Sequence, residues 1–406
     1  MVTEKESSNF LKNLLFLKVF QTFRMAIQPS KLIIAFLAMA VIYVTGWIMD
    51  LIFMAVSDSS NGVFSVLWVS ASARFHGALE ALFTFNLLGV INNFSSYLAT
   101  VGATFKEHYI YCFIFFVIKL AVISLAGGAI CRIAALHSAQ GEKPGFTEAL
   151  RFSTKKFTSF FAAPLAPIGI IIFIGFFIFL LGLVGNIPWI GKPIMVIFMP
   201  LALFAGGLIA IILIGTIAGF NLMFPAVAYD NSDCFDAISR SFSYIFAKPW
   251  RMGFYTFITL VYGAICYTFI RFFTFLLLLA TYCFLQSGIL GDNSKLAEIW
   301  QEVPTFTQLI AQPNWAELNG LESFAAFLVY ILLIAVVVLV TAFVVSFYFS
   351  ANTIIYSLMR KAVDNTALEE VYTVSETSST EPVEEKSQEQ QSSEPEEEPD
   401  LPSSAD

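Results

Sequence analysis

Residues 193–228 read PIMVIFMPLALFAGGLIAIILIGTIAGFNLMFPAVA and contain no Asp, Glu, Lys or Arg. An α-helix needs only about 20 apolar residues to cross the hydrocarbon core of a bilayer, so this run is long enough to span it. Five more runs of sufficient length lie at 32–56, 109–136, 161–185, 254–285 and 322–357. The sequence therefore predicts an all-α polytopic membrane bundle of about six transmembrane helices within residues 32–361.

The composition of the whole chain agrees with a membrane location. Only 13% of the 406 residues are charged and 57% are hydrophobic, whereas ordinary soluble domains are about 25% charged. The mean hydropathy is +0.76. A soluble chain of this size would need many more charged side chains on its surface, so the composition argues against a soluble enzyme.

The formal net charge of −8 conceals two regions of opposite sign. Residues 362–406 contain one lysine and 14 acidic residues, which leaves 21 cations against 16 acids in residues 1–361. From Asp364 onward the chain is rich in Glu, Ser, Gln, Thr and Pro, and such a segment buries too little surface to offset its conformational entropy. We therefore predict a disordered acidic tail over 362–406, which either binds a basic protein partner or remains solvated.

Lysine and arginine residues cluster on one side of the predicted spans. Positively charged loops tend to stay in the cytoplasm, whereas acidic residues have little influence on orientation. The cations predicted to lie at the lipid interface are Lys12, Lys18, Arg24, Lys31, Arg151, Lys155, Lys156, Arg240, Lys248 and Arg251. We expect an inner-membrane protein of a bacterium with both termini cytoplasmic, and the first 30 residues show no cleavable signal peptide.

A weak threefold pattern precedes spans one, three and five. The segments read SNFLKNLLFLKVFQTFRMAIQPSK (8–31), GFTEALRFSTKKFTSFFAAP (145–164) and CFDAISRSFSYIFAKPWR (234–251). A helix with apolar residues on one face and cations on the other lies in the membrane interface, with its cations near anionic lipid phosphates. The pattern favours three copies of an amphipathic elbow plus a helical hairpin, the first elbow lying in a cytoplasmic arm over 1–31. The alternative is ordinary basic loops without a repeat.

One motif resembles a known group of proteins. Phe224-Pro225-Ala226-Val227-Ala228 is followed by a short acidic linker, then by AISRSF (237–242) and KPWR (248–251). This pattern resembles a broad group of uncharacterised bacterial multi-span proteins and the membrane domain attached to some glycerophosphodiester phosphodiesterases. The resemblance covers roughly residues 110–280. It implies a helical membrane module without a known active site.

Three charged residues lie well inside the predicted spans, away from their ends: Asp50, Lys119 and Arg271. Charges in a span are costly and are therefore candidates for function. Lys119 and Asp50 form a reasonable pair, which leaves Arg271 to seek backbone carbonyls, Tyr or Asn side chains, water or an anionic ligand such as a lipid phosphate. The alternative, which we favour, is that these side chains snorkel or pair between helices for structural reasons.

Two outer connections are expected, over 57–108 and 286–321. The first is too polar for a clean span and too apolar for a flexible loop. Its apolar run 79–90 is too short to cross and is more typical of an interfacial or re-entrant helix. We expect it to cap the bundle on its outer side.

No familiar catalytic pattern is present. Among the three histidines, His76, His108 and His137, none has metal-ligand spacing, and no phosphate-binding or nucleophile motif occurs. We therefore expect no enzyme, no cofactor, no metal and no nucleic-acid partner; the expected partners are membrane lipids, mainly anionic. The leading hypothesis is a non-enzymatic component that organises or assists assembly in a lipid- or envelope-related process. The alternative is a transporter or lipid carrier with an anionic-ligand site near Arg271 and Lys119.

Overall fold

The computed structural model describes residues 15–57, 62–288, 296, 299–300, 303–306, 308–310 and 320–372. Within these ranges the regular elements are all helices. Six are long and apolar enough to cross a membrane: α3 (Pro29–Val56), α6 (Tyr109–Gln140), α9 (Ala166–Val184), α10 (Gly191–Asp230), α12 (Pro249–Gly288) and α14 (Gly320–Asp364). They confirm the number and order of the predicted spans.

Short helices precede the first, third and fifth of these long helices. They are η1 (Leu15–Gln21) and α2 (Thr22–Ala26), then α7 (Phe146–Lys155) and α8 (Phe157–Ala162), then α11 (Cys234–Ala247). The predicted order of elbow followed by helical hairpin therefore occurs three times along the chain.

Proline and left-handed residues set several helix boundaries. α3 and α12 begin at Pro29 and Pro249, where the missing N–H has no helical partner to lose. α6 ends just before Gly141 and α10 just before Asn231, and both of these capping residues have positive φ. α10 continues through Pro200 and Pro225.

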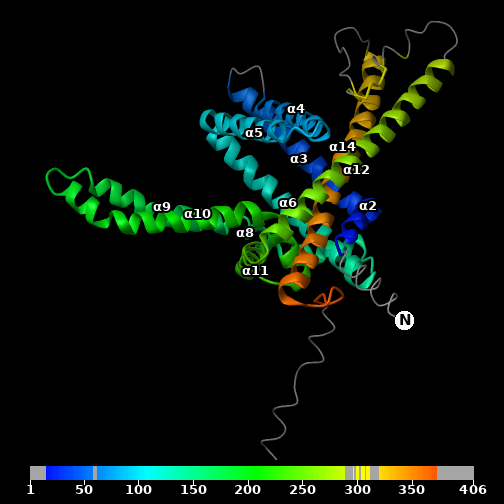
Figure 1. Ribbon diagram of the computed structural model, residues 1–406. Coiled ribbons are helices and arrows are strands. Elements are labelled where there is room, and N and C mark those ends of the chain that lie inside the picture. The colour runs from blue at the N-terminus through cyan, green and yellow to red at the C-terminus, as the bar shows by residue number, and fades with distance from the viewer. Residues whose placement is uncertain are drawn as a thin grey trace, which may run out of the picture.

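Three groups of long helices diverge from one end of the molecule, where the short helices lie (Figure 1). The groups are α3 with α6, α9 with α10, and α12 with α14 (Figure 1). The α9–α10 pair forms a long arm, and none of the most apolar stretch of α10 is buried within the chain (0%). We call the end where the groups meet the hub; bilayer lipid must cover much of the apolar surface beyond it.

The hub contains the largest buried apolar cluster. Ile130 and Ala134 of α6 pack there with Leu222 of α10 and Ile355 of α14. Glycines permit the close approach: a Cβ added at Gly127 would lie 2.5 Å from the Phe349 ring. Small residues at this helix crossing therefore act in packing within the chain, as expected for helices in a membrane.

The predicted outer loop 57–108 contains two helices, α4 (Val63–Phe83) and α5 (Leu87–Glu107), packed against each other. The run 79–90 was expected to form a single interfacial or re-entrant helix. That expectation is wrong, because the chain turns at Thr84–Asn86 and the Asn86 side chain caps α5 by accepting a bond from the Gly89 N–H. The other expected loop, 286–321, lies mostly outside the described residues.

The first part of the predicted acidic tail packs on the hub. Leu368 and Val371 are buried, and the Tyr229 hydroxyl donates a 2.8 Å hydrogen bond to the Leu368 carbonyl. The Tyr372 N–H donates to the Tyr229 carbonyl. We call residues 365–372 the C-terminal strap. The prediction of disorder from Asp364 onward is wrong for the strap, whereas residues 373–406 lie outside the described part of the chain.

Candidate functional site

Asp50 is buried and acts as a helix cap. Its two carboxylate oxygens accept hydrogen bonds from the Phe64 N–H (2.8 Å) and the Ser65 N–H (2.9 Å) in the first turn of α4. The Tyr111 hydroxyl of α6 donates a third bond to Asp50 (2.7 Å). A carboxylate at a helix N-terminus satisfies free N–H groups and complements the helix dipole. The expected pairing of Asp50 with Lys119 is therefore wrong.

Lys119 lies half-buried in α6. None of the ion pairs in the described part of the chain involves Lys119.

Arg271 of α12 connects three separate segments. Its Nη1 donates to the Tyr267 hydroxyl (2.9 Å) and to Nε2 of His76 on α4. Its Nε donates to the Phe306 carbonyl (3.1 Å), and the guanidinium lies 5.5 Å from the centre of the Phe306 ring. The expectation that Arg271 seeks a tyrosine and a backbone carbonyl agrees with these contacts.

Histidine 76 must be neutral to accept the Arg271 bond at Nε2. Burial lowers the pKa of His76 below its ordinary value, and the positive charge of Arg271 lowers it further. The cluster of His76, Tyr267 and Arg271 joins the α4–α5 pair to α12. This role was not evident from the sequence, in which His76 and Arg271 lie far apart.

A charged cluster lies at the hub around Asp230, the last residue of α10. Arg240 of α11 pairs with Asp230 at 3.0 Å, and Arg360 of α14 pairs with it at 3.4 Å. The Tyr356 hydroxyl also donates to Asp230. The Asp230 carboxylate thus links the end of α10 to α11 and to α14.

Arg240 also contacts Asp236 one turn earlier on α11, at 3.1 Å. Burial alone lowers the pKa of the Arg240 guanidinium, but the hydrogen bond to Asp236 and the charge of Asp230 more than offset this and raise that pKa above its ordinary value. The i,i+4 spacing of Asp236 and Arg240 is visible in the sequence. The contribution of Arg360 is not, because it depends on how α14 packs.

The structure divides the cations predicted for the lipid interface into two groups. Exposed cations without an ion pair among the described residues are Arg24, Arg151, Lys155 and Arg251. Cations engaged within the protein are Lys31, Lys156, Arg240 and Lys248. Lys18 is half-buried, and Lys12 lies outside the described residues.

Lys31 is the clearest departure from the expected lipid-facing role. Its side chain is fully buried (0% exposed), and its Nζ donates a 3.3 Å bond to the Ser350 hydroxyl of α14. The expectation that Lys31 contacts lipid phosphates is wrong. The reason is that α3 packs against α14 in its first turns, so the face that carries Lys31 is covered by protein.

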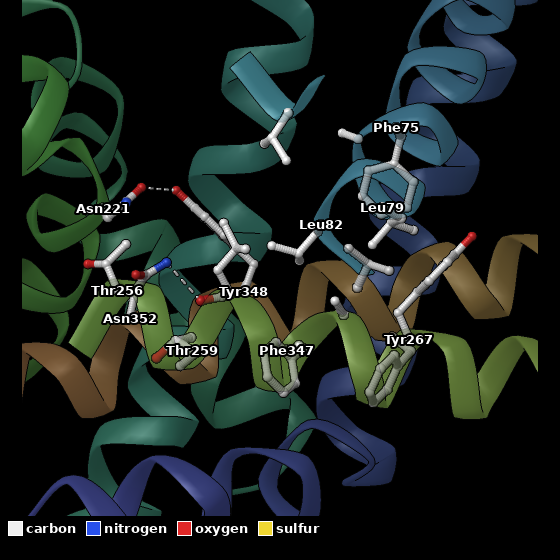
Figure 2. Close-up of a pocket in the computed structure, with 18 of the residues that line it drawn as sticks. Phe75, Leu79, Leu82, Asn221, Thr256, Thr259, Tyr267, Phe347, Tyr348 and Asn352 are labelled. Carbon is white, nitrogen blue, oxygen red and sulfur yellow. Dashed lines mark hydrogen bonds between the residues drawn. The ribbon is translucent and has the colours of Figure 1, made fainter. Parts of the chain in front are cut away.

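A cavity of about 320 Å³ lies between the α4–α5 pair, α12 and α14. Figure 2 shows Asn221, Thr256 and Asn352 gathered at one end, whereas Phe75, Leu79 and Tyr267 lie at the other. Most of the remaining lining is aliphatic or aromatic. Its size falls at the lower end of ligand-binding pockets, which are roughly 300–1,000 Å³.

Comparisons with family models, curated proteins and solved structures give no match for this chain. The resemblance to the membrane domain of some phosphodiesterases therefore stays a prediction. In the described part of the chain, no three His, Cys, Asp or Glu side chains form a group that could hold a metal ion. The six apolar helices make the protein an integral, multi-pass membrane protein.

Proposed function

We propose that the protein is a non-enzymatic component of a bacterial inner membrane that gathers anionic lipids around its hub. The observation that carries this proposal is that each of the three elbow regions has an exposed cation: Arg24, then Arg151 and Lys155, then Arg251. Anionic lipid headgroups attract each such cation by about 1 kcal/mol near the surface. The hub would face the cytoplasm, with both termini on that side.

Exposed aromatic side chains beside these cations support an interfacial position. Trp250, next to Arg251, is 91% exposed, and Phe235 on α11 is 65% exposed. Tryptophan rings favour the headgroup level of a bilayer, because their apolar body and polar N–H meet different surroundings there. Arg251 and Trp250 would therefore lie together at the level of the lipid phosphates.

A scaffold role agrees with the way the buried charges are used. Asp50 caps a helix, Arg271 joins three segments, and Asp230 links three helices. The hub would act as a rigid frame for the elbows, and the acidic tail would recruit a basic soluble partner to them. The competing idea, a carrier with an anionic site near Arg271 and Lys119, needs an anion to displace the contacts that Arg271 already makes.

The test is lipid selectivity of the full-length chain in vesicles that contain both anionic and zwitterionic phospholipids. We expect the lipid retained by the purified protein to be enriched in the anionic species. The double substitution Arg151→Gln and Lys155→Gln should reduce that enrichment by about threefold, since two surface charges are lost. Retained lipid is quantified by mass spectrometry.

The matched control removes two cations from the far ends of the hairpins. Lys106 at the end of α5 and Lys192 at the start of α10 are both exposed. The pair Lys106→Gln and Lys192→Gln changes the net charge equally and should leave the enrichment unchanged. Equal losses in both pairs would refute a specific role for the elbows.

A further inference from the structure

The cavity between the α4–α5 pair, α12 and α14 has an uncharged lining. Its lining residues come from α4, α5, α10, α12 and α14. None of these side chains is an acid, a lysine or an arginine. A fully charged ligand group would be desolvated there without a partner, which is unfavourable. The lining therefore favours a ligand that is mainly hydrocarbon.

The polar end of the cavity contains hydroxyl groups that the protein leaves unsatisfied. Thr268, Thr274 and Thr281 of α12 each donate to the backbone carbonyl four residues earlier. Thr256 and Thr259 of the same helix make no such bond, and the Thr259 hydroxyl is buried without any partner among the described residues. Both unbonded threonines line the cavity. A buried hydroxyl without a partner is unfavourable, so a ligand atom beside Thr259 is expected to bond to this hydroxyl once the side chain turns toward the cavity.

Two amide side chains complete this end. Asn221 Oδ1 accepts the Tyr348 hydroxyl, and Asn352 Nδ2 donates to the Tyr348 carbonyl at 2.9 Å (Figure 2). These bonds leave the amide N–H groups of Asn221 and the Oδ1 atom of Asn352 without partners among the described residues. The polar end therefore presents donors and an acceptor but no formal charge, which matches an ester or a hydroxyl group.

We propose that this cavity binds one acyl chain of a membrane glycerolipid, with the uncharged ester at the Asn221, Thr259 and Asn352 end. The chain would extend past Leu82 and Phe347 toward Phe75 and Tyr267 (Figure 2). The bilayer supplies this ligand at high concentration to a site between apolar helices. The site is separate from the cations of the elbows, so it does not depend on the function proposed for them.

The first experiment maps the site with photoactivatable lipids in phosphatidylcholine vesicles that contain the full-length protein. One probe is a glycerolipid whose acyl chain bears a diazirine, and the other is a free fatty acid with the same chain. We expect the glycerolipid to label peptides from 75–82 and 343–355 above the lipid-facing peptides of α9 and α10. Labelling that is uniform over all apolar helices would overturn the proposal, as would labelling of the cavity by the fatty acid alone, because its carboxylate finds no cation there.

The second experiment fills the cavity. Ala78 lines it, whereas Ala73 lies exposed on the same helix and does not. Ala78→Phe should lower glycerolipid labelling of 343–355 about tenfold, because the added ring occupies the ligand volume, and Ala73→Phe should leave it unchanged. Equal labelling in the two variants would overturn the assignment.

A subtler pair of variants tests the polar end without altering side-chain volume. Thr259→Val removes the unsatisfied hydroxyl and should weaken glycerolipid labelling by about threefold to tenfold, the range expected for one hydrogen bond. Thr268→Val removes a hydroxyl that bonds to its own helix and should have no effect on labelling. If Thr259→Val labels as strongly as the unaltered protein, the ester is not held there and the proposed orientation is wrong.

Discussion

The Tyr111 hydroxyl of α6 donates a 2.7 Å hydrogen bond to the Asp50 carboxylate of α3, and that carboxylate in turn caps α4. Gly62 lies directly against it, since a Cβ added there would approach Asp50 Oδ2 to 2.1 Å. The buried Asp50 carboxylate therefore fixes the orientation of α4 relative to α3 and α6. The α4–α5 pair in turn forms one wall of the cavity.

Loss of the Asp50 cap should destabilise the protein. We expect Asp50→Ala to lower the free energy of unfolding by about 2–3 kcal/mol, because three buried donors lose a charged acceptor. Tyr111→Phe should cost less, about 1 kcal/mol, since the two N–H bonds remain. Denaturant unfolding of the purified protein in mixed micelles measures both. Glu107→Gln, at an exposed carboxylate, is the control, and an equal effect there would contradict a specific capping role.

The contact of His76 with Arg271 predicts a pH dependence. The pKa of His76 is lowered in the folded protein by burial and by Arg271, so the folded state favours the neutral ring. Its contribution to stability is complete above the ordinary histidine pKa of 6.5 and is lost as the pH falls below it, because only the unfolded chain then gains the proton readily. Denaturant midpoints of unfolding, measured at pH values above and below 6.5, should be lower on the acidic side.

A non-titrating acceptor separates this effect from other acid effects. His76→Gln retains an oxygen that can accept from Arg271 but cannot gain a proton near neutral pH. We expect the stability of this variant to decline much less below pH 6.5 than that of the unaltered protein. A decline of the same size in His76→Gln would assign the acid sensitivity to other groups.

For Lys31, in contrast, we predict that a substitution does not lower the stability of the protein. Its buried ammonium has one neutral partner, Ser350, and no acid within ion-pair distance among the described residues. Lys31→Met keeps an unbranched side chain only one atom shorter and removes the cost of burying a charge, so we expect the free energy of unfolding to stay equal or to rise by about 1–2 kcal/mol. Lys143→Met, at an exposed cation, should change little. A clear loss of stability in Lys31→Met would show that the ammonium is needed for packing.

The spans were predictable because crossing a membrane is a property of one continuous segment. The run 193–228 has the length and composition for it without reference to any other part of the chain. Elbows could be anticipated for the same reason, since the aromatic and basic pattern of 234–251 is local. The helices α3 and α12 begin at Pro29 and Pro249, a few residues before the predicted starts at 32 and 254.

The sites could not be predicted in the same way, because they join distant segments. The sequence suggested Lys119 as the partner of Asp50, yet two of the three Asp50 partners come from the start of α4, a helix that the sequence did not reveal as such. His76 and Arg271 are 195 residues apart. The cavity is lined from α4, α5, α10, α12 and α14, so its existence depends on how these helices cross.

The C-terminal strap gives the last prediction. Burial of Leu368 and Val371 and the bond from Tyr229 predict that residues 365–372 stabilise the hub. A chain that ends after Asp364 should lose roughly 3 kcal/mol of unfolding free energy, a conservative value for two buried aliphatic side chains. Arg132 should also become more mobile, because its Nη2 donates to the Tyr372 carbonyl at 2.8 Å.

A chain that ends after Tyr372 is the matched comparison, since it loses 11 of the 14 acidic residues of the tail and keeps the strap. Its unfolding free energy should equal that of the full chain, because a solvated acidic segment contributes little to packing. Thermal and denaturant unfolding of both truncations in the same micelles distinguish the two regions. If the two shortened chains are equally stable, the strap contacts contribute nothing measurable. If the longer one also loses stability, residues 373–406 themselves bind the hub, and the electrostatic attraction between this acidic segment and the exposed cations Arg24, Arg151 and Arg251 would be the reason.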